Sequence, residues 1–330
     1  MPRDHETSRP TLEDLARGLD RLAASGKLTR EFDAHGEATF TAARPAPMPA
    51  LMALSFLCSL GTGSLWTGLP FVAEHDFQFT KSQNMWLAVA ESAVYAVVAF
   101  FSGRLLKRLG RFASPRTVLG GILLFMLAMC MLPLTGSLWA LVATALGVSA
   151  ASAIMWPIVE SYLSSGRHGH QLRSAVGVFN IVWTTATAAG LVLMGPVFAT
   201  DFSRIAIVAI GPVCALGVLC LPWFPASPPP HLERGMPSAV PPVYRPLRSA
   251  SRALLPTSYL LIGTIGPMLP YITGAIGVAP EWQTPVSSTW HAVRVVAMLA
   301  MWRLAFWHGK WSTLAVGGAL MAGGFLLAMG

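Results

Sequence analysis

Charged residues are scarce in this 330-residue chain: they make up 12% of the sequence, whereas hydrophobic residues make up 54% and the mean hydropathy is +0.56. A soluble domain carries about 25% charged residues, so this chain has too few charges to cover a water-facing surface. The deficit excludes soluble enzymes, disordered chains and fibrous repeats. Cysteine is also rare, and the sequence predicts four small buried thiols and no disulfide framework or zinc site: Cys58, Cys130, Cys214 and Cys220.

Several functional signals are missing as well. The first ten residues contain no apolar stretch, so we expect no cleavable signal peptide. The sequence holds no GxxxxGK[ST] loop, which argues against transport powered by nucleotide hydrolysis. We find no catalytic constellation, and the loop residues His168 and His170 are too few for a metal site. We therefore expect no enzyme activity, no cofactor and no metal, and no nucleic-acid partner because the basic residues lie between apolar runs.

The charges that are present divide the chain into two parts. Residues 1–47 hold seven Lys or Arg and eight Asp or Glu, which is 15 of the 38 charged residues. The rest of the chain contains apolar runs of about 20 residues, long enough to cross a membrane as helices. The sequence thus predicts an all-α polytopic membrane protein with nine spans, at approximately 49–72, 83–106, 116–135, 137–163, 174–198, 204–224, 254–278, 286–308 and 312–330.

Basic residues alternate between the two sides of the predicted membrane. The connections after the second, fourth, sixth and eighth spans hold five, two, four and two Lys or Arg, and the others hold at most one. The positive-inside rule then places these connections and the N-terminus in the cytoplasm of a multi-pass cell-membrane protein surrounded by lipid.

The same reading divides the chain into four regions. Residues 1–47 form a cytoplasmic arm, in which leucines spaced three and four apart predict an amphipathic helix: Leu12, Leu15, Leu19 and Leu22. A six-helix bundle follows at 48–224. The Pro-rich stretch 225–253 is predicted to be a cytoplasmic linker, and 254–330 is predicted to be a partial bundle of three helices.

The loop after the second span resembles a known signature. Residues 103–111 read GRLLKRLGR, which is similar to G-x-L-x-D-R-x-G-R of the major facilitator superfamily. Five residues fit this pattern: Gly103, Leu105, Arg108, Gly110 and Arg111. Lys107 replaces the acidic residue that helps to latch the two halves of family members, which puts that latch in doubt here.

Two later segments resemble the same family. Trp156, Pro157 and Glu160 in the fourth span fit its W-P-x-x-E form, and the fifth span carries Asn180, Trp183 and several glycines, as the family's fifth helix does. The resemblance implies two bundles that rock about a central solute site. Since the family is normally built from twelve helices, the chain is expected to be a fragment, a truncated reading frame or a protein that needs a partner subunit.

Three ionisable side chains stand out inside the predicted spans, where such groups are costly and mark functional sites by default: Glu91, Glu160 and Arg294. Glu91 shares a helix face with Asn84 and Tyr95. It is a candidate proton carrier, and a structural hydrogen bond to a neighbouring helix explains it equally well.

Arg294 lies about 12 Å inside the eighth span, on the same face as Trp290. It could hold an anionic group of a solute or pair with a carboxylate, or else extend to the headgroups. The family resemblance implies that the fifth and eighth helices face each other, so that Asn180 and Thr184 look toward Arg294. His291 is expected to be an interface residue.

Glu160 lies about one turn from the cytoplasmic end of its span, near the basic loops. We predict a cytoplasmic gate in which it pairs with arginine, formed with Gly103, Arg108, Gly110 and Arg111. Taken together, the sequence predicts a secondary transporter that moves a small solute by alternating access, driven by an ion gradient, as a symporter or antiporter, or by the solute gradient itself. Proton coupling through Glu91 is the sharpest version of this prediction. The alternatives are a membrane receptor or scaffold that carries nothing, and, with less support, a membrane enzyme that acts on lipid.

Overall fold

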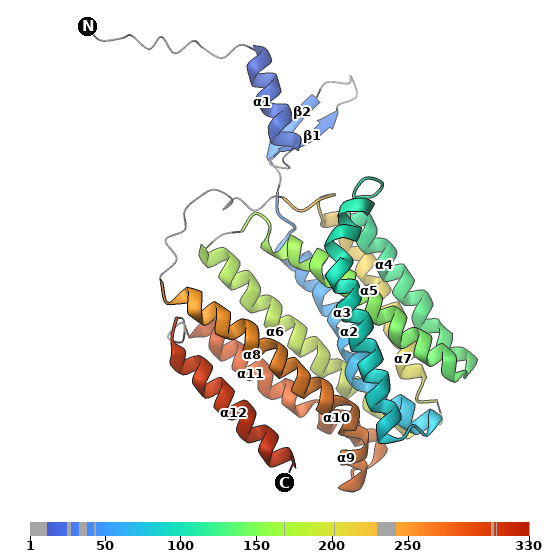
Figure 1. Cartoon of the computed structure of the whole chain (residues 1–330). Helices are drawn as coiled ribbons and strands as arrows, with labels where there is room; N and C mark the ends of the chain where they lie inside the picture. Colours follow the sequence, from blue (N-terminus) through green and yellow to red (C-terminus); the bar gives the residue numbers. More distant parts are fainter. Residues whose placement is uncertain are drawn as a thin grey trace.

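The computed structural model describes residues 12–24, 28–32, 38–42, 44–167, 169–200, 202–229, 242–304, 307 and 309–329. Its long helices form one bundle, and a small head lies beyond one end of that bundle (Figure 1). We call this end the head side and the opposite end the far side. The last helix ends at the far side (Figure 1).

The head contains the predicted amphipathic helix and a hairpin that was not predicted. Helix α1 covers Leu12–Ala24, as the leucine spacing indicates. Strands β1 (Leu28–Phe32) and β2 (Ala38–Ala42) pair antiparallel, with Leu28 opposite Ala42. The alternation of apolar and charged residues in LTREF is a strand signal, but it is short and lies among the charges of the arm. Apart from this hairpin, the described elements are helices.

The first six predicted spans are helices, three of which continue into a 3-10 segment. They are α2 (Met48–Phe77), α3 (Lys81–Leu109), α4 (Pro115–Met131) with η1 (Leu132–Thr135), α5 (Leu138–Ser164), α6 (Gly169–Met194) with η2 (Gly195–Ala199), and α7 (Ile205–Leu216) with η3 (Gly217–Trp223). Local sequence sets several of these boundaries. Thr80 and Gln83 form a capping box at the start of α3, and the Ser114 hydroxyl accepts from the Thr117 amide at the start of α4. Gly136 adopts a φ of 71° in the tight turn between η1 and α5, a conformation that favours glycine.

The remaining helices are more irregular. They are α8 (Tyr244–Ile265) with η4 (Gly266–Met268), α9 (Leu269–Ala275), α10 (Pro280–Ser287), α11 (Thr289–Arg303) and α12 (Trp311–Met329). Helix α8 begins ten residues earlier than the predicted span at 254–278, so the end of the expected linker is helical.

Seven described helices are long and apolar enough to cross a membrane, and a shorter apolar helix covers Trp311–Leu327. The predicted eighth span is not one continuous helix, because α10 ends at Ser287 and α11 begins at Thr289. The prediction of an all-α polytopic membrane protein is confirmed.

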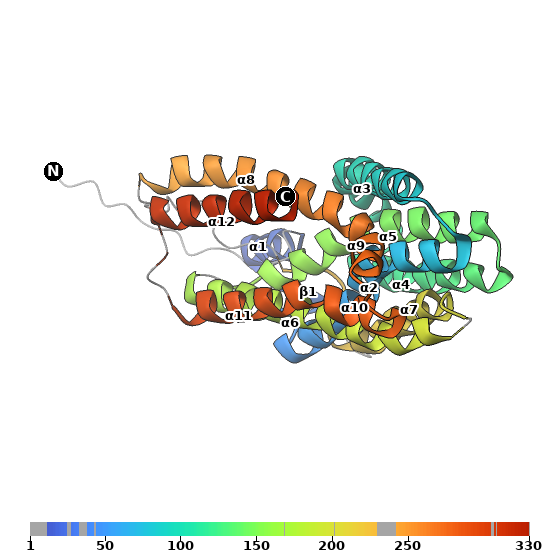
Figure 2. The ribbon, with the colours of Figure 1, turned by 90° about the horizontal axis from the view of Figure 1, so that it is seen from below.

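Helix α2 is central to the packing. It contacts α5, α6 and α7, while α4 packs on α7, α3 on α5 and α11 on α6. Helices α8 and α12 lie side by side, away from α6 and α11 (Figure 2). The four cysteines are free thiols, three of them buried and Cys220 half-buried, which agrees with their predicted role except for that partial exposure.

Candidate functional site

Glu91 lies on the packed face of α3. Its side chain is only 8% exposed, and it shares this face with the buried residues Asn84, Leu87 and Ser102. Its Oε1 atom makes no hydrogen bond to any residue that the structure describes. A buried polar atom without a partner costs about 1–3 kcal/mol, and the structure describes no structural hydrogen bond at this oxygen that would offset the cost.

Two other side chains of this face link α3 to neighbouring helices. The Asn84 amide donates to the Tyr271 hydroxyl at 2.8 Å, which joins α3 to α9. Tyr95 packs edge-on against Trp66 of α2, with ring centroids 5.4 Å apart. The predicted polar face of α3 is therefore turned toward protein along its length.

Arg294 stacks on the fifth predicted span, as the family resemblance implied. Its Cζ atom lies 4.3 Å from the centroid of the Trp183 ring on α6, a distance typical of a cation–π contact. Among the described residues, no carboxylate pairs with Arg294. Asn180 and Thr184 lie within one turn of Trp183, and the Thr184 hydroxyl donates to the Asn180 carbonyl at 2.8 Å.

Three buried polar residues precede Arg294 on α10 and α11. Thr284, Ser287 and His291 are 0%, 5% and 3% exposed. Neither hydroxyl oxygen nor either ring nitrogen makes a hydrogen bond to a described residue. The His291 ring stacks on Trp290, with ring centroids 3.6 Å apart. The sequence marked His291 as an interface residue but gave no sign of Thr284 and Ser287, because isolated hydroxyls are common in membrane helices.

The structure thus separates the predicted pathway residues into two groups. Glu91, Tyr95 and Asn84 belong to α3, whereas Asn180, Thr184, Trp290 and Arg294 belong to α6 and α11. The two views show α3 and α11 well apart in the bundle (Figures 1 and 2). In this conformation the two groups are separate.

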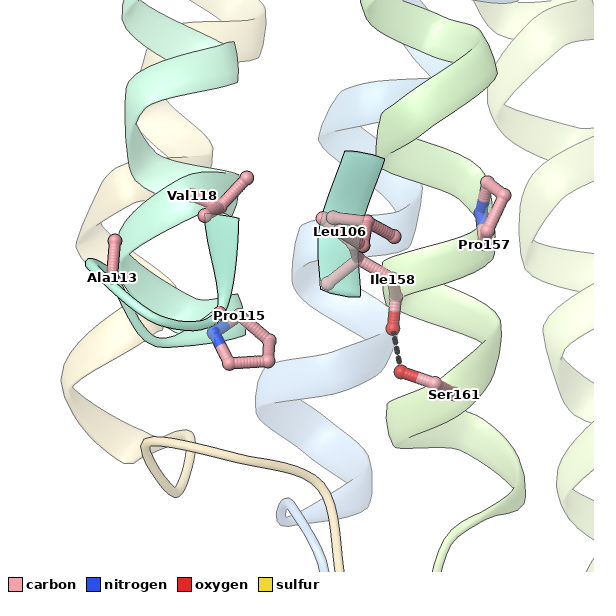
Figure 3. Close-up of a pocket in the computed structure, with 8 residues that line it drawn as sticks. Leu106, Ala113, Pro115, Val118, Pro157, Ile158 and Ser161 are labelled. Atoms are coloured by element: carbon pink, nitrogen blue, oxygen red, sulfur yellow. Dashed lines mark hydrogen bonds between the residues drawn. The ribbon is translucent and has the colours of Figure 1, made fainter. Parts of the chain in front are cut away.

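The two motifs predicted to form a gate meet on the head side. They enclose a small pocket of about 120 Å³ between the turn that joins α3 to α4 and the last turns of α5. Figure 3 shows most of the residues around it, and the Ser161 hydroxyl donates there to the Ile158 carbonyl at 2.6 Å. The pocket is lined by Leu106, Gly110, Ala113, Pro115, Val118, Pro157, Ile158 and Ser161.

The expected ion pair of Glu160 is absent from the described residues. Its side chain is exposed, as are Gly103, Arg108, Gly110 and Arg111.

Arg167 on the same side is buried and uses its guanidinium on backbone carbonyls instead. It donates to those of Ala46 at 2.6 Å, Tyr162 at 2.9 Å and Leu163 at 3.0 Å. These bonds fix the start of α2 to the end of α5. The prediction of an ion pair between Glu160 and a nearby arginine is therefore wrong for this conformation.

Among the described residues, no group of three His, Cys, Asp or Glu side chains is placed to hold a metal ion. His168, one of the two loop histidines, lies outside the described residues.

A comparison with family models matches residues 51–330 to the model described as Major Facilitator Superfamily. A comparison with curated proteins gives no match. The matched region contains every predicted pathway and gate residue.

Proposed function

Because the chain belongs to the Major Facilitator Superfamily, a family of membrane transporters, we propose that it is a secondary active transporter that carries a small anionic solute by alternating access. The observation that carries the choice of an anion is Arg294. An arginine inside a membrane helix costs about 2.5–3.5 kcal/mol, and here no described carboxylate compensates its charge. An oxyanion of the solute would supply the missing partner, since a guanidinium binds carboxylate or phosphate with two parallel hydrogen bonds.

We further propose that a proton accompanies the solute. Glu91 supports this, because its buried carboxyl group has an oxygen without a described partner and can take up or release a proton as the bundles move. The head-side gate is assigned to Gly103, Arg108, Gly110, Arg111 and Glu160, which flank or line the pocket between α3, α4 and α5. The head side is assigned to the cytoplasm from its basic connections.

A thermal-shift screen of the purified protein tests the solute class. Amino acids, sugars, drugs and organic anions are added in turn, and a bound solute raises the melting temperature by mass action. We expect shifts from organic anions, and we expect Arg294→Gln to weaken their binding about 30-fold or more, because it removes one partner of a buried charge pair.

Arg303→Gln is the matched control. Arg303 lies on the same helix and also stacks on a tryptophan, with its Cζ 5.3 Å from the Trp302 ring centroid, but at the end of α11. Shifts from sugars or cations alone would overturn the proposed class. Counterflow of the bound anion in proteoliposomes then tests transport, and an anion that binds but does not exchange would indicate a receptor.

A further inference from the structure

At the far side of the bundle, hydrogen bonds join the earlier helices to the later ones. The Asn84 amide donates to the Tyr271 hydroxyl at 2.8 Å and to the Pro70 carbonyl at 3.0 Å. The Tyr271 hydroxyl donates in turn to the Phe79 carbonyl at 2.6 Å. We call Asn84, Tyr271 and the Phe79 carbonyl the far-side latch. It joins the connection between α2 and α3 to α9.

A second contact between the same two halves runs along α6. At the far side, a Cβ atom on Gly195 would lie 2.7 Å from Cγ of Pro285 on α10. Toward the head side, a Cβ atom on Gly177 would lie 3.0 Å from Cγ of Trp302 on α11. The helices therefore touch at both ends of this contact, which we call the α6 seam. A solute can pass between them only if they separate.

The side chains within the α6 seam are polar. Thr284, Ser287, His291 and Arg294 follow one another at three, four and three residues. Ser288, between the two helices, keeps a helical conformation (φ −77°, ψ −12°), so this spacing places the four residues on one side of α10 and α11. The first three are buried and bond to no described residue. By contrast, the neighbouring Ser288 hydroxyl donates to the Pro285 carbonyl at 2.7 Å. A stripe of unused donors and acceptors leads from the far side toward Arg294.

We propose that Thr284, Ser287 and His291 line the far-side access path to Arg294, where they bind the polar groups of an entering anionic solute, and that the far-side latch holds this path shut. In this conformation the two hydroxyls and the imidazole are buried and have no hydrogen-bond partner among the described residues. When the bundles separate at the far side, the same groups face the path and can bond to water or to the solute. The stripe thus favours opening, and the latch opposes it.

This inference rests on the proposed transport function, because only a transporter needs a path that opens on the far side. It assigns no role to Glu91 and none to the head-side gate. It can therefore fail while the proposed function stands.

Cysteine labelling tests the path without any knowledge of the solute. Ser287→Cys is introduced into the full chain, and the purified protein is treated with a charged maleimide that reacts only in water. We expect slow labelling with the latch intact. Tyr271→Phe removes only the latch hydroxyl and should raise the labelling rate of Cys at position 287 about fivefold, because a net hydrogen bond is lost from the closed state. Asn84→Ala should have the same effect.

Tyr259→Phe is the matched control, since the ring of Tyr259 lies on α8 and is 52% exposed. The chain without Ser287→Cys gives the background from the four natural cysteines, and Thr284→Cys is a second reporter if the first variant is not monodisperse. Fast labelling with the latch intact would overturn the inference. So would a rate that Tyr271→Phe and Asn84→Ala leave unchanged. If the latch variants raise the labelling rate but Arg294→Gln does not weaken anion binding, the access path is supported and the proposed class of solute is overturned.

Discussion

Glu91 lies on α3, a helix long and apolar enough to cross a membrane, and Arg294 lies on the shorter helix α11; the surroundings of the two side chains differ. Glu91 is packed against protein on α3 with an unbonded oxygen, whereas Arg294 rests on the face of Trp183. A carboxyl group can change its charge by losing a proton, but a guanidinium stays charged. We therefore propose the proton-carrying role for Glu91 and the anion-binding role for Arg294.

Glu91→Gln should abolish proton coupling while retaining solute exchange, because the amide resembles a permanently protonated carboxyl group. With one proton per solute, a pH difference of one unit drives about tenfold accumulation, since a factor of ten corresponds to about 1.4 kcal/mol. In proteoliposomes that contain Glu91→Gln, accumulation of the solute under that pH difference should fall to the level measured without a pH gradient. Glu281→Gln, which removes a carboxylate at the far-side start of α10, is the control. Unchanged accumulation by Glu91→Gln would show that the proton travels elsewhere.

For these individual residues, the sequence predicted which side chains are unusual but not which residues they contact. Glu91 and Arg294 stand out because charge is rare within apolar runs. The bond between Asn84 and Tyr271 joins residues 187 positions apart, and no periodicity in a linear sequence encodes such a pairing. The ion pair of Glu160 was expected from nearby basic residues, but Arg167 is bound to backbone carbonyls and the other arginines of the gate are exposed.

Between elements, the packing depends on where glycine lets two helices approach. A Cβ atom on Gly211 of α7 would lie 2.9 Å from Cβ of Cys130 and 3.1 Å from the Leu127 carbonyl oxygen on α4. These neighbours are backbone or close to it and cannot rotate away. By contrast, a Cβ atom on Gly121 of α4 would have nothing within 4 Å.

Gly211→Ala should therefore lower the stability of the chain by about 1–3 kcal/mol, the usual cost of overpacking a filled interface. Gly121→Ala should leave it unchanged or raise it slightly, because alanine favours a helix more than glycine does. The apparent melting temperature of each purified variant, measured from the monodisperse peak after heating, provides the comparison. Equal melting temperatures for the two variants would mean that α4 and α7 are not packed as closely as described.

Element boundaries show why periodicity predicts some helices better than others. Continuous apolar runs such as Leu138–Ser164 leave little doubt about a span, and that helix agrees closely with the prediction. The run at 286–308 is less apolar, because it contains Arg294 and Arg303, and Pro280 and Pro285 precede the interruption of the helix at Ser288. The break places Thr284 and Ser287 on a separate short helix, and the helical conformation of Ser288 lets them continue the side of His291 and Arg294.

For the whole molecule, the positive-inside rule assigns the head side to the cytoplasm, and the transport proposal takes its direction from that assignment. Ser82 at the far-side start of α3 and His170 at the head-side start of α6 are both exposed. In intact cells, a membrane-impermeant maleimide should therefore label Ser82→Cys and leave His170→Cys unlabelled until the membrane is permeabilised. The unsubstituted chain gives the background from Cys58, Cys130, Cys214 and Cys220. The opposite pattern would place the head outside the cell. The far-side end of the proposed pathway to Arg294 would then face the cytoplasm.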